Sequence, residues 1–198
     1  MNQEIEIEFK NLLEESEYLT LLNNLFDSSS QEYFQKNVYF DTKEYVLKEH
    51  LCALRIRLKD SYAEMTLKTP FNGHHKELNM TMDKEDAEEF IQNGVFTVPE
   101  EINNILNDEN IPSIHTVNRI ADLKTKRIEK STDEGLIVLD KSWYSDTIDY
   151  ELEVESHSIE TGEKLFQSIL SSFSIPERKT ENKIARAFKA IRTDKTQL

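Results

Sequence analysis

Carboxylates recur at every second position in two stretches, one near the start of the chain and one near its end. The first stretch reads EIEIEFK and contains Glu6 and Glu8; the second reads YELEVE and contains Glu151 and Glu153. Side chains of a β-strand alternate between its two faces, so the members of each pair share a face, about 7 Å apart along the backbone. If the two strands lie near each other, the four carboxylates form an oxygen-ligand site suited to Mg²⁺ or Mn²⁺.

Cationic side chains have the same period-two spacing in other predicted strands. They occur in ALRIRLK, EMTLK and KTKRIEK, at Arg55, Arg57, Lys59, Lys68 and Arg127. A solvated sheet face normally mixes both signs of charge, whereas here acidic and basic strands are separate. A guanidinium group can grip two phosphate oxygens at once, so these strands are candidates for phosphate binding. An ordinary antiparallel sheet with one solvated face would give the same alternation, and this alternative stays open.

A closed or nearly closed β-barrel would supply the geometry that these strands need. Its apolar outer face would pack against helices, while the charged residues would line a polar lumen. Such a lumen has to be hydrated or filled by metal and a polyanion, because buried charges are costly without partners. In the long strand around residue 120, Arg119, Thr125, Arg127 and Glu129 share one parity, so Arg119 is a further candidate for the lumen.

The ordered set of these stretches resembles the CYTH superfamily, the triphosphate tunnel metalloenzymes. EIEFK matches the E-x-E-x-K signature of that family. It is followed in order by NVYFDT, the R-x-R of LRIRLK, the lysine of MTLK, a basic strand ending at Arg127, the E-x-E of YELEVE and a C-terminal NKIARAF. The resemblance covers nearly the whole chain and is greatest to compact bacterial members that are often labelled adenylate cyclases.

The resemblance implies an α+β fold in which an eight-stranded antiparallel β-barrel, with helices packed outside, binds triphosphate compounds with a divalent metal. The implied metal ligands are Glu6, Glu8, Glu151 and Glu153. The implied phosphate-binding residues are Lys10, Arg55, Arg57, Lys68, Arg127 and Lys183. The expected catalytic residues are Glu6, Glu8, Lys10 and Arg57, with Glu77, Asp140 and Arg119 as further lumen candidates. For Lys183, a solvated helix face shared with Lys179 and Arg186 is the alternative.

Three positions depart from the family pattern or extend it. The family often has a basic residue where this chain has Thr125, which removes one phosphate contact or shifts the register of that strand. Glu4 and Glu155 extend the acidic pairs outward, and neither has an assigned role.

The activity that the resemblance implies is metal-dependent hydrolysis of a triphosphate, with inorganic triphosphate as the expected substrate. A class IV-like adenylate cyclase would convert ATP to cyclic AMP in the same tunnel. It would need a pocket for adenine, and no set of residues in the sequence indicates one. A thiamine triphosphatase would need an aromatic platform, for which Trp143, Tyr144 and Tyr39 are candidates, although each is more typical of a packed core. A polyphosphate- or nucleotide-binding module is the non-enzymatic alternative, and the presence of both E-x-E pairs argues against it.

Hydrophobic periodicity places these groups on strands interspersed with helices. Strands are expected at residues 4–10, 34–42, 51–60, 62–70, 76–82, 117–130, 134–144 and 147–156, with a hairpin turn at Asp60-Ser61. Helices are expected at residues 12–26, 84–93, 99–106, 162–173 and 176–192. Asp83 should cap the second of these helices and Gly94 should end it. No linker divides the chain, so residues 1–198 are predicted to form a single domain.

Composition narrows the class of protein. The 198 residues are 37% hydrophobic and 31% charged, which is typical of a globular chain. The net charge of -14 argues against binding nucleic acid through a broad basic surface. The single cysteine, Cys52, excludes an internal disulfide and a thiolate zinc site. With no long apolar run and no signal region, we expect a soluble cytoplasmic protein whose partner is a small triphosphate-bearing substrate. The oligomeric state stays open, a homodimer included.

Overall fold

The structure is a computed structural model that describes residues 2–59, 62–72 and 74–194. The predicted turn at Asp60-Ser61 lies outside these residues. Among the described residues, no helix is both long enough and apolar enough to cross a membrane.

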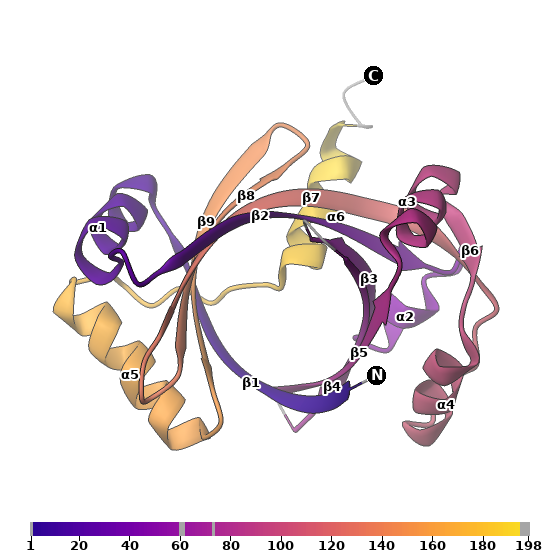
Figure 1. The fold of residues 1–198 in the computed structure, drawn as a ribbon, viewed down its shortest axis with the longest axis horizontal. Helices are drawn as coiled ribbons and strands as arrows, with labels where there is room; N and C mark the ends of the chain where they lie inside the picture. Colours follow the sequence, from indigo (N-terminus) through magenta and orange to yellow (C-terminus); the bar gives the residue numbers. More distant parts are fainter. Residues whose placement is uncertain (1, 60–61, 73, 195–198) are drawn as a thin grey trace. The chain divides into compact units, whose positions relative to one another are not determined.

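The strands belong to one hydrogen-bonded, nine-stranded sheet (Figure 1). They are β1 (Asn2–Leu13), β2 (Gln31–Asp41), β3 (Ala53–Leu58), β4 (Ala63–Phe71), β5 (His74–Met82), β6 (Val95–Thr97), β7 (Thr116–Ser131), β8 (Leu136–Tyr144) and β9 (Thr147–Ser156). Their order is β2-β3-β4-β5-β1-β9-β8-β7-β6, and β2 also pairs with β7. The eight strands from β2 round to β7 therefore make a closed circuit, which confirms the predicted antiparallel β-barrel.

The helices in the described ranges lie between the strands and after them, as an α+β fold requires. They are α1 (Glu15–Leu25), α2 (Val46–Glu49), α3 (Lys84–Asn93), α4 (Glu100–Asp108), α5 (Ile159–Ser172) and α6 (Lys183–Asp194). Gly94 ends α3 in the left-handed conformation, with φ +68°, so the predicted stop signal is confirmed.

The chain divides into two compact units. Unit 1 is the chain up to Ile5 together with Lys36–Asp122, and unit 2 is Glu6–Gln35 together with the chain from Leu123 onward. Strands β1, β2 and β7 each contribute a part to both units. That the whole chain acts as a single domain stays a prediction.

Unit 2 has an apolar core between its strands and two helices. Helices α1 and α5 pack on the apolar face of β9 and its neighbours, where Leu139, Leu152 and Val154 are fully buried (Figure 1). Helix α5 approaches the sheet closely at Gly162, where an added Cβ would lie 2.9 Å from a ring carbon of Phe9. The apolar positions of the period-two pattern therefore face the helices.

Unit 1 has its own core, on the apolar face of β3, β4 and β5. Residues of α2, α3 and α4 pack there against buried side chains such as Leu54, Ile56 and Leu67. The aromatic ring of Phe96 in β6 stacks on Phe90 of α3, with ring centroids 4.8 Å apart. Neither α2 nor β6 was predicted, because at four and three residues they are too short to show a period.

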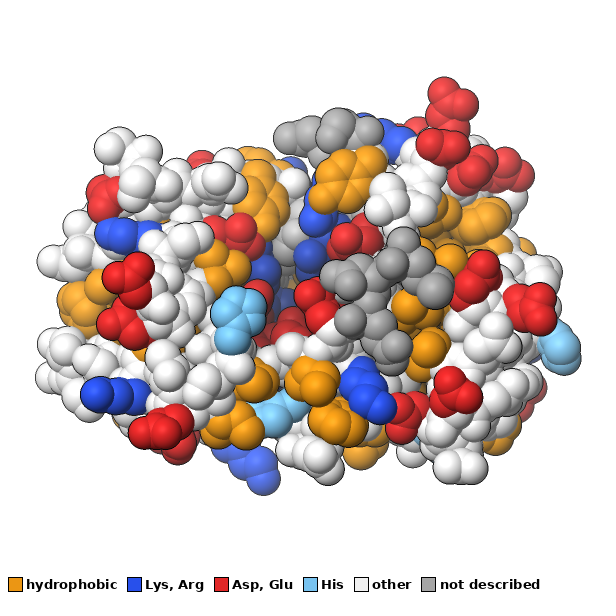
Figure 2. Space-filling model, turned by 60° about the horizontal axis from the view of Figure 1, so that its bottom comes forward, with side chains coloured by type: hydrophobic (Ala, Val, Ile, Leu, Met, Phe, Trp, Pro, Cys, Tyr) orange, Lys and Arg blue, Asp and Glu red, His pale blue; other side chains and the backbone are white. Residues whose placement is uncertain are grey.

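The polar face of these strands is buried rather than solvated. Arg55 and Thr66 of unit 1 are at most 8% exposed, and Asp140, Glu151 and Glu153 of unit 2 are at most 5% exposed. These values exclude the alternative of an ordinary wet sheet face. By contrast, Figure 2 shows further Asp and Glu side chains scattered over the molecular face that it displays, in keeping with the net charge of -14.

Two predicted helices begin later than expected. β1 continues to Leu13, so α1 starts at Glu15 and not at residue 12. α6 starts at Lys183, and the preceding residues from Pro176 are not helical. They bind β1 instead: Nδ2 of the Asn11 side chain donates to the carbonyl of Pro176 at 3.1 Å, and the backbone amide of Leu12 donates to the hydroxyl of Thr180 at 3.1 Å. These tertiary hydrogen bonds replace the helical ones.

Candidate active site

The central feature of unit 2 is a group of three carboxylates. Glu8 of β1 and Glu151 and Glu153 of β9 each bring one carboxylate oxygen to within 4.8 Å of the others. The strand register explains this convergence, because β1 and β9 are antiparallel neighbours in which Lys10 lies opposite Glu153. Side chains that are opposite or diagonal on one face of such a pair lie within reach of each other. The predicted proximity of the two acidic strands is thus found for three of the four glutamates.

Glu6, the fourth predicted metal ligand, does not belong to this three-carboxylate group. It is half-buried and lies two residues before Glu8 on the same side of β1. Its role as a ligand stays a prediction.

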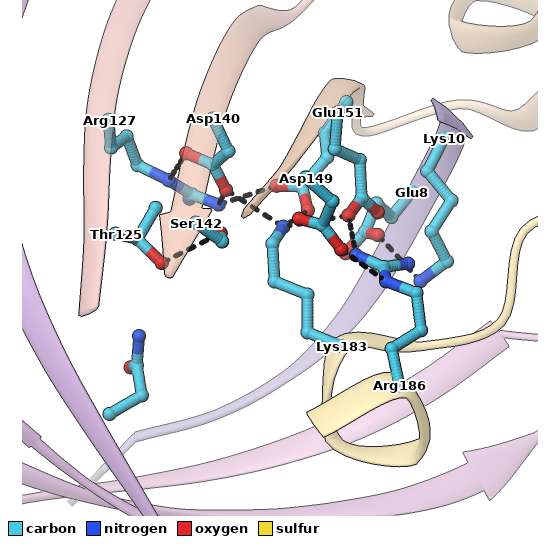
Figure 3. A network of polar contacts seen from close by, with 12 residues as sticks. Glu8, Lys10, Thr125, Arg127, Asp140, Ser142, Asp149, Glu151, Lys183 and Arg186 are labelled. Atoms are coloured by element: carbon cyan, nitrogen blue, oxygen red, sulfur yellow. Dashed lines mark hydrogen bonds and ion pairs between the residues drawn. The ribbon is translucent and has the colours of Figure 1, made fainter. Parts of the chain in front are cut away.

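Two lysines surround the carboxylates (Figure 3). Nζ of Lys10 lies 2.9 Å from Glu8. Nζ of Lys183, at the start of α6, contacts Glu153 and lies 2.8 Å from Asp140 and 3.3 Å from Glu151. The side chain of Lys183 is only 13% exposed, so the alternative of a solvated helix face is wrong for this residue.

Arg127 of β7 is hydrogen-bonded to acidic residues of β8 and β9. It lies opposite Asp140 of β8 and makes two hydrogen bonds to it, of 2.8 and 2.7 Å, while its Nη2 also lies 2.5 Å from Glu153. One step along the same face, the hydroxyls of Thr125 and Ser142 are 3.1 Å apart. The register of β7 against β8 is therefore regular. At the position where a basic residue was expected, Thr125 forms a neutral hydroxyl pair with Ser142.

Arg186 and Asp149 belong to the same network, although the sequence analysis did not assign them to the site. Nε of Arg186 donates to Asp149 at 2.9 Å, and its Nη2 contacts Glu151 (Figure 3). The hydroxyl of Tyr144 donates to the same oxygen of Asp149 at 2.5 Å. The signal was present: Arg186 lies three residues after Lys183 on one helix face, and Asp149 lies two residues before Glu151 on one strand face.

The pKa values of the two glutamates of β9 are shifted in opposite directions. Burial raises the pKa of Glu151 above its ordinary value, and the nearby Lys183 only partly offsets this. Burial acts in the same direction on Glu153, but Lys183 and Arg127 outweigh it and hold the pKa of Glu153 well below its ordinary value. The carboxylates in turn raise the pKa of Lys183 and of Lys10 against the effect of burial, so both lysines stay protonated.

The three-carboxylate group fits a hard divalent metal ion. All of its donors are carboxylate oxygens, which Mg²⁺ and Mn²⁺ prefer. Oε1 of Glu151 is buried and has no hydrogen-bond partner among the residues that the structure describes. This oxygen therefore has lone pairs available for a ligand. Binding a ligand there would also remove the cost of leaving a buried charged oxygen unsatisfied.

The polar face of unit 1 carries the predicted basic residues. Nη2 of Arg55 donates to Thr66 at 3.3 Å, while its buried Nε has no hydrogen-bond partner in the described part of the chain. Nε of Arg57 donates to Asn37 at 2.9 Å, and Lys68 pairs with Glu77 on the neighbouring strand. These cations lie on β3 and β4, with the apolar residues of each strand on the opposite face.

Glu4 and Arg119, two further residues of unit 1, differ in their environment from the buried cations. Glu4, which had no assigned role, accepts a hydrogen bond of 3.1 Å from Asn79 on the polar face of β5. Arg119 is 42% exposed and pairs with the equally exposed Asp122 at 3.3 Å. Its placement in a lumen stays a prediction.

Comparison with known proteins decides the family. The CYTH domain family model matches residues 4–188. The chain belongs to the CYTH family. A protein named "Putative triphosphatase YjbK" from Bacillus subtilis (strain 168) is 37% identical to this CYTH domain over 193 residues, which cover 97% of this chain and 98% of that protein.

Solved structures of other proteins are also similar to this CYTH domain. The crystal structure of a "putative adenylate cyclase" from Bacillus halodurans has a TM-score of 0.83 and 37% identity, and the match covers 95% of this chain and all of that one. A "putative adenylyl cyclase" from Hippeastrum, described as revealing a dominant triphosphatase activity, has a TM-score of 0.72. The match covers 94% of this chain and 95% of that one, and at 23% identity the likeness concerns the fold alone.

Proposed function

We propose that this CYTH domain is a divalent-metal-dependent hydrolase of triphosphate compounds, with inorganic triphosphate as its preferred substrate. The observation that carries the proposal is the convergence of Glu8, Glu151 and Glu153 beside the cations Lys10 and Lys183. A metal ion held by carboxylates beside ammonium groups is what binding of a polyphosphate requires. The 37% identity to a relative named as a triphosphatase supports the same reaction.

In this proposal Glu8, Glu151 and Glu153 hold the metal, and Glu6 is a further candidate ligand. The bound ion would neutralise charge on the phosphate oxygens and orient or activate the attacking water. Lys10, Arg127 and Lys183 bind phosphate oxygens and stabilise the charge that develops on the transferred group. Asp140 orients Arg127 and Lys183 through the contacts described above. Catalysis then rests on positioning and electrostatics rather than on a covalent intermediate.

The basic face of unit 1 is proposed to contribute phosphate-binding residues. Arg55, Arg57 and Lys68 are the candidates, since each offers a cation on the polar face of β3 or β4. Arg55 has a buried Nε that lacks a hydrogen-bond partner among the described residues, which is a group that an anion would satisfy. Glu77 would keep Lys68 protonated and oriented.

Inorganic triphosphate is preferred because the candidate aromatic platforms are already engaged. Trp143 stacks on Phe34, with ring centroids 6.4 Å apart. The hydroxyl of Tyr144 is bound to Asp149, and Tyr39 is buried. Trp143 and Tyr144 are thus already engaged with neighbouring groups and Tyr39 is buried, which disfavours all three rings as platforms for adenine or thiamine.

Adenylate cyclase activity is the second candidate, because the Bacillus halodurans relative of equal identity carries that description. Product analysis separates the candidates. The purified protein is incubated with inorganic triphosphate, thiamine triphosphate or ATP, each with Mg²⁺ or Mn²⁺. Orthophosphate and pyrophosphate from inorganic triphosphate would support the proposal. Cyclic AMP from ATP would identify a cyclase, and binding of all three without any product would identify a binding module.

The metal-binding carboxylates are tested with Glu153→Gln and Glu8→Gln. Each substitution keeps the shape of the side chain and removes the charge, so turnover should fall by about 100-fold or more if the residue holds the metal. Glu163→Gln on the exposed face of α5 is the matched control and should retain wild-type activity. Full metal-dependent activity of Glu153→Gln would contradict the assignment.

A further inference from the structure

Arg186 contacts Glu151, a member of the proposed metal site, while its remaining nitrogens bind other groups. Its Nη2 contacts Oε2 of Glu151. Its Nε donates to Asp149 at 2.9 Å, and its Nη1 contacts the backbone carbonyl of Glu181. The guanidinium therefore has two ends that are fixed outside the three-carboxylate group and one end that lies on a member of it.

In this arrangement Arg186 and a bound metal ion would compete for the charge of Glu151. Glu151 is 1% exposed, so its charge needs compensation whether or not a metal is bound. Without metal, Arg186 and Lys183 supply that compensation. A divalent ion that binds the carboxylate oxygens weakens the attraction between Glu151 and Nη2 of Arg186, because it neutralises the same charge at shorter range.

We propose that Arg186 is an exchange residue: it pairs with Glu151 in the metal-free protein and with a substrate phosphate when a divalent metal occupies the carboxylate group. Asp149 and the carbonyl of Glu181 keep the guanidinium in place during the exchange, so only the Nη2 end changes partner. This inference rests on the proposed function, since it takes the metal site and a phosphate-bearing substrate as given. It adds a residue that binds substrate only after metal has bound.

The proposal predicts opposite effects of one substitution on two equilibria. Arg186→Gln removes the cation that competes for Glu151, so Mn²⁺ should bind more tightly, by about tenfold, as expected for loss of one charged hydrogen bond. The same substitution removes a phosphate contact. Imidotriphosphate, a triphosphate with non-hydrolysable bridges, should therefore bind about tenfold more weakly at saturating Mn²⁺. A merely structural role would weaken both equilibria.

Both affinities are measured by isothermal titration calorimetry on the full chain, without turnover. Arg178→Gln is the matched control, because Arg178 precedes α6 and pairs with Glu17 and Glu14 rather than with the carboxylate group. It should leave both affinities at the wild-type value. If Arg186→Gln does not fold, Arg186→Lys takes its place, since a single ammonium cannot reach Asp149, Glu181 and Glu151 together; both shifts should keep their signs and be smaller.

The outcomes separate the exchange from the proposed function. Tighter Mn²⁺ binding together with weaker imidotriphosphate binding would support the exchange. Unchanged or weaker Mn²⁺ binding by the Arg186 variant would overturn it, while the metal-dependent function would stand as long as the wild type binds Mn²⁺. A wild-type protein that binds no Mn²⁺ would overturn the metal site itself, and the exchange with it.

Discussion

Arg127 and Asp140 face each other across β7 and β8 and are joined by two hydrogen bonds of 2.8 and 2.7 Å. Asp140 is fully buried and also lies 2.8 Å from Nζ of Lys183. One carboxylate thus orients two of the proposed phosphate-binding cations. Because Asp140 contacts these two cations, we assign it to positioning them and not to binding the metal.

Removing the charge of Asp140 should therefore destabilise the protein strongly. Asp140→Asn leaves Arg127 and Lys183 with less compensation in a buried site, and we expect a loss of about 3 kcal/mol in the free energy of unfolding. Urea denaturation measures it. Asp122→Asn, at an exposed pair with Arg119, is the control and should change stability by less than about 0.5 kcal/mol. Equal stabilities of the two variants would contradict the role of Asp140.

Arg57 should contribute to substrate binding more than to turnover. Arg57→Ala removes one cation from the basic face of β3 without touching the carboxylate group, so KM for triphosphate should rise by about tenfold, with a smaller change in kcat. Steady-state kinetics at saturating Mn²⁺ measure both constants. Lys43→Ala, at an exposed position outside every proposed site, is the control and should leave both constants unchanged. A fall in kcat with an unchanged KM would show that Arg57 acts in the chemical step instead.

Metal binding should stabilise the folded protein. In the proposed function Mn²⁺ binds the native carboxylate group and not the unfolded chain, so at about 100 times its dissociation constant it should add roughly 2.7 kcal/mol to the stability. A thermal unfolding series with increasing Mn²⁺, followed by chelation, measures the rise and its reversal. Glu8→Gln should show a much smaller rise. An equal rise in wild type and variant would indicate that Mn²⁺ binds elsewhere.

The contact between Glu17 and Arg178 should make stability depend on pH in the acid range. Burial raises the pKa of Glu17, but the hydrogen bonds from Arg178 outweigh it and hold the pKa below its ordinary value of 4.5. A lowered pKa means that the stabilisation is present above pH 4.5 and is lost as the pH falls through the native value. Glu17→Gln should cost about 1 kcal/mol at pH 7 and progressively less in acid. Unfolding curves between pH 7 and pH 3 test this, and a constant difference would contradict it.

Gly162 should resist substitution although it lies in a helix. Alanine favours a helix interior by about 1 kcal/mol over glycine. Here, however, the added Cβ would lie 2.9 Å from both Phe9 and Ser156, which forces α5 away from the sheet. We expect the cost of overpacking to exceed the gain in helix propensity, so Gly162→Ala should lower the free energy of unfolding by about 1–2 kcal/mol. Ser171→Ala, on the exposed face of the same helix, should be neutral or slightly stabilising.

Much of the barrel could be predicted because its signal is local. The alternation in stretches such as EIEIEFK and YELEVE follows from the two faces of a strand, and every predicted strand is present. Boundaries were less accurate where tertiary hydrogen bonds compete with helical ones. Residues from Pro176 to Asn182 have a helical pattern but bind Asn11 and Leu12 of β1 instead.

The sequence by itself determined which residue types share a strand face, and through the ordered motifs it determined the CYTH family. Only the tertiary structure decided which of those faces meet: register and sheet order bring Glu8 to Glu151 and Glu153, and leave Glu6 outside that group. It also brought Arg186 and Asp149 into the network and placed Arg119 at the surface. The physical reason is that strand parity is a property of neighbouring residues, whereas charge pairing depends on distances between segments far apart in the chain.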